Sequence, residues 1–232
     1  MMRELVMDTE TTGLDPTDGH RIVEIGAVEL VNHMPTGRTY HQYINPQRPM
    51  PPEAFAIHGL GDDFLSRQPV FEAIVDAFLE FVRDDRLVIH NAAFDMRFLN
   101  AELQAAARPV LPNDRALDTL DIARRRFPGS PASLDALCRR FGIDNSARDK
   151  HGALLDSEIL AEVYLELIGG RQPDFGLSAA QTSATPAAQT GQTRTRKRPT
   201  PLPPRLTEAE ADAHRRFVDA LSDGALWTRY AR

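Results

Sequence analysis

The chain has 232 residues, of which 42% are hydrophobic and 26% charged, the composition of an ordinary globular protein. Its single cysteine, Cys138, excludes a disulfide scaffold and a cysteine-based zinc site. No apolar stretch approaches the roughly 20 residues that span a bilayer. The first residues lack the apolar core of a secretory signal, so we expect a cytoplasmic protein with no membrane partner.

The net charge of −6 is unevenly distributed along the chain. Residues 1–170 carry 17 Lys and Arg against 27 Asp and Glu, whereas residues 171–232 carry 10 basic and 6 acidic residues. The acidic excess of the larger part argues against a protein that grips long duplex DNA by neutralising phosphates. It is compatible with bound metal ions, which reverse the local sign of a carboxylate-rich cleft.

Within residues 1–170, the hydrophobic pattern predicts strands first and helices afterwards. Strands are expected at 3–8, 22–31 and 36–44, joined by short polar links of the hairpin type. Four prolines between 45 and 52 predict an extended loop. A brief apolar strand is expected at 87–89, among amphipathic helices at 71–82, 94–107, 119–127, 133–141 and 151–168. This order is typical of an α/β layer fold.

The composition changes after residue 170. Residues 177–206 contain no acidic residue, five basic residues and much Ala, Gln, Thr and Pro. Such a segment buries too little apolar surface to fold, so we expect a flexible linker over 171–206. Thr207 and Glu210 form a capping-box pattern that predicts a short helix at the start of a final segment, 207–232.

Two carboxylates, Asp8 and Glu10, stand at the end of the first predicted strand. The alternation of a strand points both side chains to one face, where they repel each other unless a cation joins them. A solvated strand end is the plain alternative for this pair. The polar, small-residue turn at 11–13 favours a site instead, because it lets another molecule approach the backbone.

Three further candidates lie at later junctions of the chain. Asp95 follows a predicted buried strand at the start of a helix, where α/β proteins often place catalytic groups. It would otherwise only stabilise the helix N-terminus. His151 and Asp156 stand at the start of the last predicted helix. Taken alone, the histidine is a surface or capping residue.

Together these residues form a known pattern. Asp-x-Glu-Thr-x-Gly at 8–13, His-Asn-x-x-Phe-Asp at 90–95 and His-x4-Asp at 151–156 resemble the histidine-bearing branch of the DEDD exonuclease superfamily. Residues 3–170 are similar to the epsilon proofreading subunits of bacterial DNA polymerase III. The resemblance implies a ribonuclease H-like exonuclease fold over 1–170, with a mixed central sheet flanked by helices. It also implies 3′→5′ excision of mispaired nucleotides from DNA ends.

The resemblance assigns roles to these residues. Asp8, Glu10, Asp95 and Asp156 would bind two divalent metal ions, Mg²⁺ or Mn²⁺, which suit oxygen ligands and hydrolyse phosphodiesters. His151 would be the general base. The terminal nucleotide would contact Thr11, Leu14, Ile57, His58, Asn91 and Phe94. Plain alternatives remain: core packing for Ile57 and Phe94, a helix cap for Asn91 and an ordinary loop for His58.

The same resemblance implies protein partners. Gln172, Phe175 and Leu177, within 172–177, resemble a short motif that binds the sliding clamp, although an ordinary linker start explains them too. Residues 207–232 would bind the polymerase catalytic (alpha) subunit through Phe217, Leu221, Leu226 and Trp227, unless this tail folds back onto the exonuclease domain. Whether a small theta-type subunit also binds stays open.

Three competing interpretations deserve a test. A free-standing nuclease of this superfamily would trim RNA or repair intermediates, but the tail beyond residue 170 argues against it. A non-catalytic scaffold joining clamp and polymerase would be favoured by loss of one of the five catalytic positions, and all five are present. An α/β domain with chance matches is hard to reconcile with three ordered motifs.

Overall fold

The computed structural model describes residues 2–146, 148, 150–169 and 207–221. The chain divides into two units, Met1–Leu177 and Ser178–Arg232, and each is considered by itself. Among the helices in the described part of the chain, none is long and apolar enough to cross a membrane.

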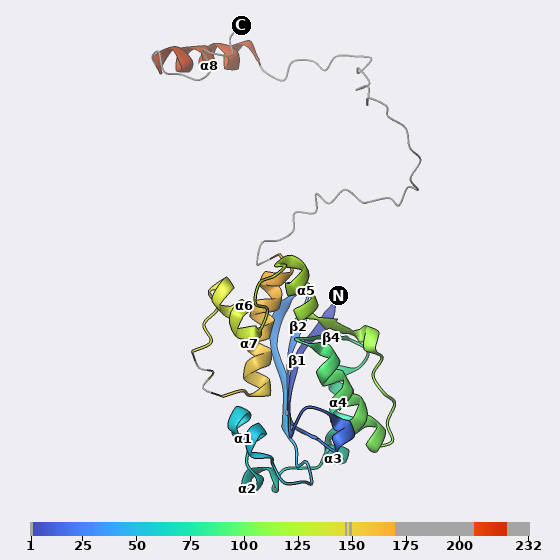
Figure 1. Cartoon of the computed structure of the whole chain (residues 1–232). Helices are drawn as coiled ribbons and strands as arrows, with labels where there is room; N and C mark the ends of the chain where they lie inside the picture. The colour runs from blue at the N-terminus through green and yellow to red at the C-terminus, as the bar shows by residue number, and fades with distance from the viewer. Residues whose placement is uncertain (1, 147, 149, 170–206, 222–232) are drawn as a thin grey trace, which may run out of the picture. The chain divides into compact units, whose positions relative to one another are not determined.

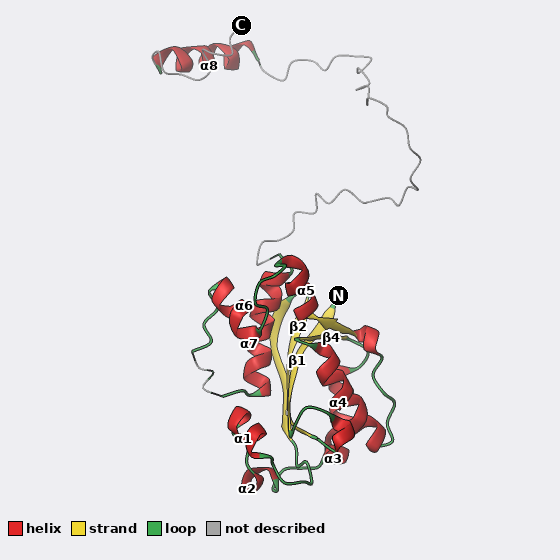
Figure 2. Ribbon diagram, viewed as in Figure 1, coloured by secondary structure: helices red, strands yellow, loops and turns green. Residues whose placement is uncertain are grey.

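A mixed sheet of five strands, in the order β3-β2-β1-β4-β5, forms the centre of the first unit. Figure 2 shows its strands in yellow between the red helices. The first three strands are antiparallel neighbours, whereas β4 and β5 run parallel to β1 and to each other. The two hairpin-type links predicted between the first three strands are therefore confirmed. The strands are β1 (Arg3–Thr11), β2 (Ile22–Val31), β3 (Met34–Tyr43), β4 (Arg86–Ile89) and β5 (Ala116–Asp118).

Helices cover both faces of this sheet (Figure 1). Helices α3 (Phe71–Val82) and α4 (Ala92–Ala105) pack with the sheet into one buried apolar cluster. Helices α5 (Thr119–Arg126), α6 (Leu134–Phe141) and α7 (Ala153–Leu167) form a second cluster on the other face. The arrangement is the layered α/β fold predicted from the sequence.

The sequence pattern missed several short elements. Helices α1 (Pro52–His58) and α2 (Asp62–Leu65) were not predicted, and Pro52 belongs to α1 rather than to the expected loop. Proline suits the first turn of a helix because its missing N–H has no partner there anyway. The three-residue strand β5 and the 3-10 turns at Pro16–Asp18 and Asn113–Arg115 are too short to show a period.

The alternation of β1 determines which groups reach the site. Leu5 and Met7 point into the cluster with α3 and α4, whereas Val6 points into the cluster with α7. Continuing this alternation puts Asp8 and Glu10 on the α7 side, as the sequence predicts. The strand therefore carries its two carboxylates toward the beginning of α7.

A glycine in β2 lets α7 come close to the sheet. Gly26 is the partner of Asp8 across the β1–β2 pair. A Cβ added at Gly26 would lie 2.2 Å from backbone atoms of Ala153 and Leu154, so only glycine fits. The Ser157 hydroxyl, one turn along α7, donates a hydrogen bond to the Gly26 carbonyl at 3.0 Å. The first turn of α7 thus lies beside Asp8.

In the second unit the described residues form one helix, α8 (Glu208–Ala220). Thr207 and Glu210 make the reciprocal hydrogen bonds of a capping box, which confirms the prediction from the sequence. Phe217 is 62% exposed and Leu221 is 42% exposed. The clamp-motif residues 172–177, and Leu226 and Trp227 of the predicted polymerase contact, lie outside the described residues.

Candidate active site

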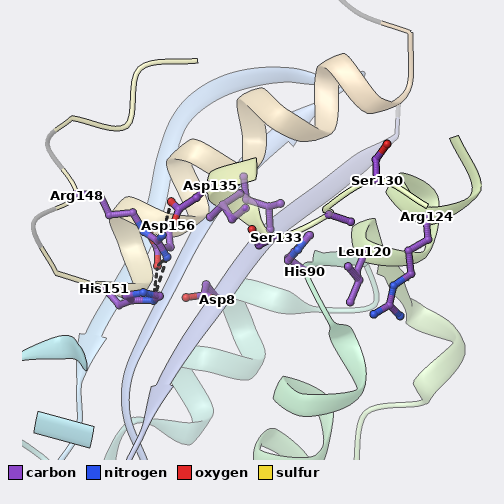
Figure 3. A pocket seen from close by; sticks show the side chains of 13 residues that line it. Asp8, His90, Leu120, Arg124, Ser130, Ser133, Asp135, Arg148, His151 and Asp156 are labelled. Carbon is purple, nitrogen blue, oxygen red and sulfur yellow. Dashed lines mark hydrogen bonds and ion pairs between the residues drawn. The ribbon is translucent and has the colours of Figure 1, made fainter. Parts of the chain in front are cut away.

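Four carboxylates from three elements meet at one end of the sheet. Asp8 and Glu10 come from the end of β1, Asp95 from the first turn of α4, and Asp156 from the first turn of α7. Glu10, Asp95 and Asp156 are 8%, 2% and 3% exposed, and Asp8 is partly exposed. Figure 3 shows Asp8, His151 and Asp156 close together at one side of the pocket that they line. The structure therefore brings together the five residues predicted to be catalytic.

Crowding and burial shift the protonation of these acids. Burial, followed by the charges of Asp156 and Glu24, raises the pKa of Glu10 to about 8. Burial raises the pKa of Asp95 to about 7, against an opposing hydrogen bond of 2.7 Å from the Thr9 hydroxyl. Burial and neighbouring carboxylates also raise the pKa of Asp8 well above its usual range. Such a cluster is stabilised by a cation.

His151 lies just before α7, at the rim of the carboxylate cluster. Its side chain is 49% exposed, and its Nδ1 is 3.5 Å from an oxygen of Asp156. Its backbone N–H donates to the Ile57 carbonyl of α1 at 3.3 Å, which connects this loop to the α1 region. The histidine is therefore accessible to a bound molecule while remaining in contact with the acids.

The side chains present suit a hard divalent cation. Among the described residues, ligand atoms of Glu10, His151 and Asp156 lie within 4.8 Å of one another. Asp8 lines the same hollow as His151 and Asp156, and the charges of Asp95, Glu10 and Asp156 raise its pKa, so these carboxylates act on one another. Oxygen-rich donor sets favour Mg²⁺, Mn²⁺ or Ca²⁺ over softer metals.

Two hollows adjoin this cluster. The first has a volume of about 590 Å³ and is lined by Asp8, His151 and Asp156, with His90, Arg124 and Ser133 on its far walls. The second has a volume of about 490 Å³ and is lined by Ile57, His151, Arg139 and Lys150 among others. Both are large enough for a nucleotide-sized ligand.

The six residues predicted to contact a nucleotide differ in their exposure and in the residues that they contact. Ile57 is 52% exposed and lines the second hollow, so it is not a core residue. Leu14 is 80% exposed beyond the end of β1. Phe94 is half-buried against Phe98, with ring centroids 5.0 Å apart, so it belongs partly to the core.

The other three are polar. Thr11 is buried at the end of β1, and its hydroxyl donates to the Gly13 carbonyl at 2.7 Å. His58 is buried at the end of α1, where its Nδ1 accepts the Leu60 N–H at 3.0 Å. Burial, aided by the nearby Lys150 and His151, lowers the pKa of His58, so this imidazole is neutral at pH 7.

Asn91 has a left-handed backbone, with φ 68° and ψ 52°, at the start of α4. Its side chain makes no capping hydrogen bond within the described structure. Asp118 fills that role instead, because its two oxygens accept the backbone N–H groups of Asn91 and Ala92 at 3.0 and 3.1 Å. The cap interpretation of the Asn91 side chain is therefore wrong, although Asn91 occupies the N-cap position of α4 and is exposed.

Sequence reasoning missed two residues that organise the site. Asp118 also caps α5 through the Leu120 N–H, so one carboxylate orders two helix starts, and its position just before a predicted helix was a usable signal. Arg148 contacts Asp156 and His151 directly. Nothing in the polar segment around Arg148 distinguishes it from a solvated loop cation.

Comparison with known proteins agrees with this geometry. The exonuclease family described as RNase_T matches residues 5–164. DNA polymerase III subunit epsilon of Rickettsia felis is 48% identical over 223 residues, which cover 95% of this chain and 97% of that protein. The subunit epsilon of Escherichia coli K12 is also 48% identical, over 176 residues that cover 73% of this chain and 72% of that protein.

Solved structures show the same fold. The nuclease domain of 3′hExo, a DEDDh family member, superposes with a TM-score of 0.63 at 20% identity, covering 72% of this chain and 91% of that one. Exonuclease X, solved with 5′ overhanging duplex DNA, gives a TM-score of 0.56 at 26% identity with the same coverage. The chain therefore belongs to the exonuclease (RNase_T) family and, within it, to the epsilon subunits of DNA polymerase III.

Proposed function

We propose that this protein excises mispaired nucleotides from DNA 3′ ends, as the proofreading subunit of the replicative polymerase. The observation that carries the proposal is the convergence of four carboxylates and His151 at one end of the sheet, beside two hollows. Family membership supplies the 3′→5′ direction and the polymerase context.

Asp8, Glu10, Asp95 and Asp156 would hold two divalent ions, Mg²⁺ or Mn²⁺. When bound, such ions activate a water molecule and stabilise charge on the attacking and leaving oxygens of a phosphodiester. The chain's own contribution to the chemistry is the imidazole of His151, which is exposed at the rim and accepts the proton of the attacking water.

The terminal nucleotide would lie among Thr11, Leu14, Ile57, His58, Asn91 and Phe94. Exposed apolar side chains such as Leu14 and Ile57 contact any base without reading its identity, which suits an enzyme that removes all four nucleotides. The neutral imidazole of His58 and the exposed amide of Asn91 offer polar contacts to sugar or phosphate.

The same proposal assigns three regions. Residues 1–170 are the exonuclease domain, 171–206 the linker with a clamp-binding motif at 172–177, and 207–232 the segment that binds the polymerase alpha subunit. The exposed Phe217 of α8 and Leu221 at its C-cap support the last assignment, because exposed apolar groups on a helix favour contact with a partner. A theta-type subunit is not required by any contact described above.

The test is digestion of a 3′-mismatched primer with Mg²⁺ by the wild type, Asp8→Ala and Asp156→Ala. We expect both variants to lose excision while remaining folded, because a lost ligand removes metal charge that nothing else replaces. Glu158→Ala, an exposed acid two residues beyond Asp156 on the same helix, is the matched control and should keep activity.

Substrate comparison completes this test. Faster digestion of single-stranded or mismatched DNA than of RNA supports proofreading, whereas a preference for RNA would favour a free-standing trimming nuclease. Activity of Asp8→Ala within a few-fold of the wild type would rule out the assigned site.

A further inference from the structure

The carboxylate cluster contains a cation that belongs to the chain itself. Arg148, on the segment between α6 and α7, is only 9% exposed at its side chain. Its Nη2 donates to Asp156 Oδ2 at 2.7 Å, and its Nε donates to the other oxygen, Oδ1 (Figure 3). This is the two-point pairing that guanidinium and carboxylate groups form when both are well placed.

The same guanidinium also engages the proposed base. Arg148 Nη2 lies 3.0 Å from His151 Nδ1. A guanidinium has no acceptor, so the imidazole nitrogen must accept this hydrogen bond, and His151 is then neutral with Nδ1 occupied. Arg148 therefore pairs at the same time with Asp156, a proposed metal ligand, and with His151, the proposed base.

This pairing competes with a bound divalent ion for the charge of Asp156. Both carboxylate oxygens of Asp156 already accept hydrogen bonds from Arg148. A Mg²⁺ or Mn²⁺ ion would need at least one of those oxygens at roughly 2.0–2.2 Å, and it would repel a guanidinium at the same carboxylate. The arginine and the ion therefore compete for Asp156.

A second carboxylate would still hold Arg148 if Asp156 bound a metal ion. Asp135, on α6, accepts a hydrogen bond from Arg148 Nη1 at 2.8 Å and is half exposed. Asp135 and Arg148 both line the first and the second hollow. A guanidinium that left Asp156 would still be anchored on the wall between the hollows.

We propose that Arg148 is a built-in competitor of the metal: it holds Asp156 and His151 in the metal-free enzyme, and ion binding displaces it onto Asp135. This inference rests on the proposed function, because it concerns the same metal site. It gives Arg148 two opposite effects, since the residue stabilises the metal-free fold and weakens metal binding.

The experiment measures Mn²⁺ binding to the full chain, by the loss of the free-ion electron paramagnetic resonance signal, with no nucleic acid present. We expect Arg148→Gln to bind Mn²⁺ roughly ten-fold more tightly, the usual worth of a lost charge-assisted pair. Arg148→Lys, which keeps the charge without the planar fork, should lie between Arg148→Gln and the wild type. Arg139→Gln, which removes another cation that lines the second hollow, should bind as the wild type does.

Thermal melting provides a second readout. Arg148→Gln should melt below the wild type in chelator, and the gap should close at saturating Mn²⁺, because the ion then neutralises Asp156 in both proteins. Mn²⁺ affinity unchanged or weaker in Arg148→Gln would overturn the proposal. If the wild type and Asp156→Asn bound Mn²⁺ equally, the metal site of the proposed function would itself be wrong, which is a different result.

Discussion

Buried acids with raised pKa values make the metal-free protein sensitive to pH. The folded state holds protons on Glu10 (pKa about 8) and Asp95 (pKa about 7) more tightly than the unfolded chain does. Stability without metal should therefore fall as pH rises from the ordinary range of carboxyl pKa values, about 4, up to about 8. Metal binding should strengthen over the upper part of that range, because the ion binds the ionised form.

Calorimetry at pH 6, 7 and 8, in chelator and in Mg²⁺, measures this linkage. We expect the melting temperature to drop with pH in chelator and to drop less with Mg²⁺. Glu10→Gln should flatten the drop in chelator, because its side chain does not titrate. A melting temperature that rose from pH 6 to pH 8 in chelator would contradict the raised pKa values.

The general-base role proposed for His151 predicts a change in excision rate without a loss of metal binding. His151→Ala should lower the rate of excision by roughly 10²–10⁴, the usual worth of a general base. At saturating metal, where the ion already holds the carboxylates in their ionised form, the acidic limb of the pH–rate profile should disappear with it. Mn²⁺ binding measured without substrate should persist, which distinguishes loss of a base from loss of the metal site. An acidic limb that matched the wild type would remove His151 from that role.

Individual residues differ in how far the sequence predicts them. Asp8 and Glu10 were predictable because strand alternation fixes their common face, and the structure places them together. Arg148 was not, because its effect depends on a loop bringing it back to Asp156, eight residues along the chain. The capping role of Asp118 can be predicted only in part. The preference for Asp at helix starts identifies it as the cap of α5, but no local pattern shows that it also caps α4.

Elements were predicted where their hydrophobic period is long. The helix at 71–82 is observed over those bounds as α3, and the strand at 22–31 as β2. The short elements α1, α2 and β5 lack enough residues to display a period, so sequence reasoning missed them. The close approach of α7 to Gly26 depends on tertiary packing, so the hydrophobic pattern of either segment alone does not predict it.

Gly26 gives a prediction at the level of elements. Gly26→Ala would place a methyl group 2.2 Å from the backbone of α7, so the helix start must shift away from β1. We expect a loss of about 1–3 kcal/mol or more in unfolding free energy and a large loss of excision, since Asp156 moves with the helix. Denaturant unfolding and primer digestion measure the two effects.

Gly152→Ala is the matched control for stability. A Cβ at Gly152 meets nothing within 4 Å, and this residue also stands at the start of α7. Its unfolding free energy should stay close to that of the wild type. Equal stability of Gly26→Ala and Gly152→Ala would show that α7 tolerates a shift from the sheet.

At the scale of the whole molecule, the proposed role of residues 207–232 in polymerase binding can be tested by truncation. A protein ending at residue 206 should keep its thermal stability and its digestion of free oligonucleotides, but lose co-purification with the polymerase alpha subunit. Trp227→Ala in the full chain should weaken that association by more than ~2 kcal/mol if Trp227 is an anchor.

Two controls make the truncation decisive. Phe217→Ala removes an exposed apolar group of α8 and should also weaken the association, whereas Asp219→Ala, an exposed acid on the same helix, should not. A truncated protein that was markedly less stable, yet still bound the polymerase, would show that residues 207–232 belong to the core of the exonuclease domain.

The docking of α7 against Gly26 also bears on the order in which the enzyme is made. Asp8 emerges from the ribosome some 150 residues before Asp156 and its helix, at a synthesis rate of about 5–20 residues per second. The strands can pair earlier, because β1, β2 and β3 are consecutive neighbours. A nascent chain that still lacks α7 therefore has an incomplete set of acids, and we expect nuclease activity to begin only when translation has delivered this helix.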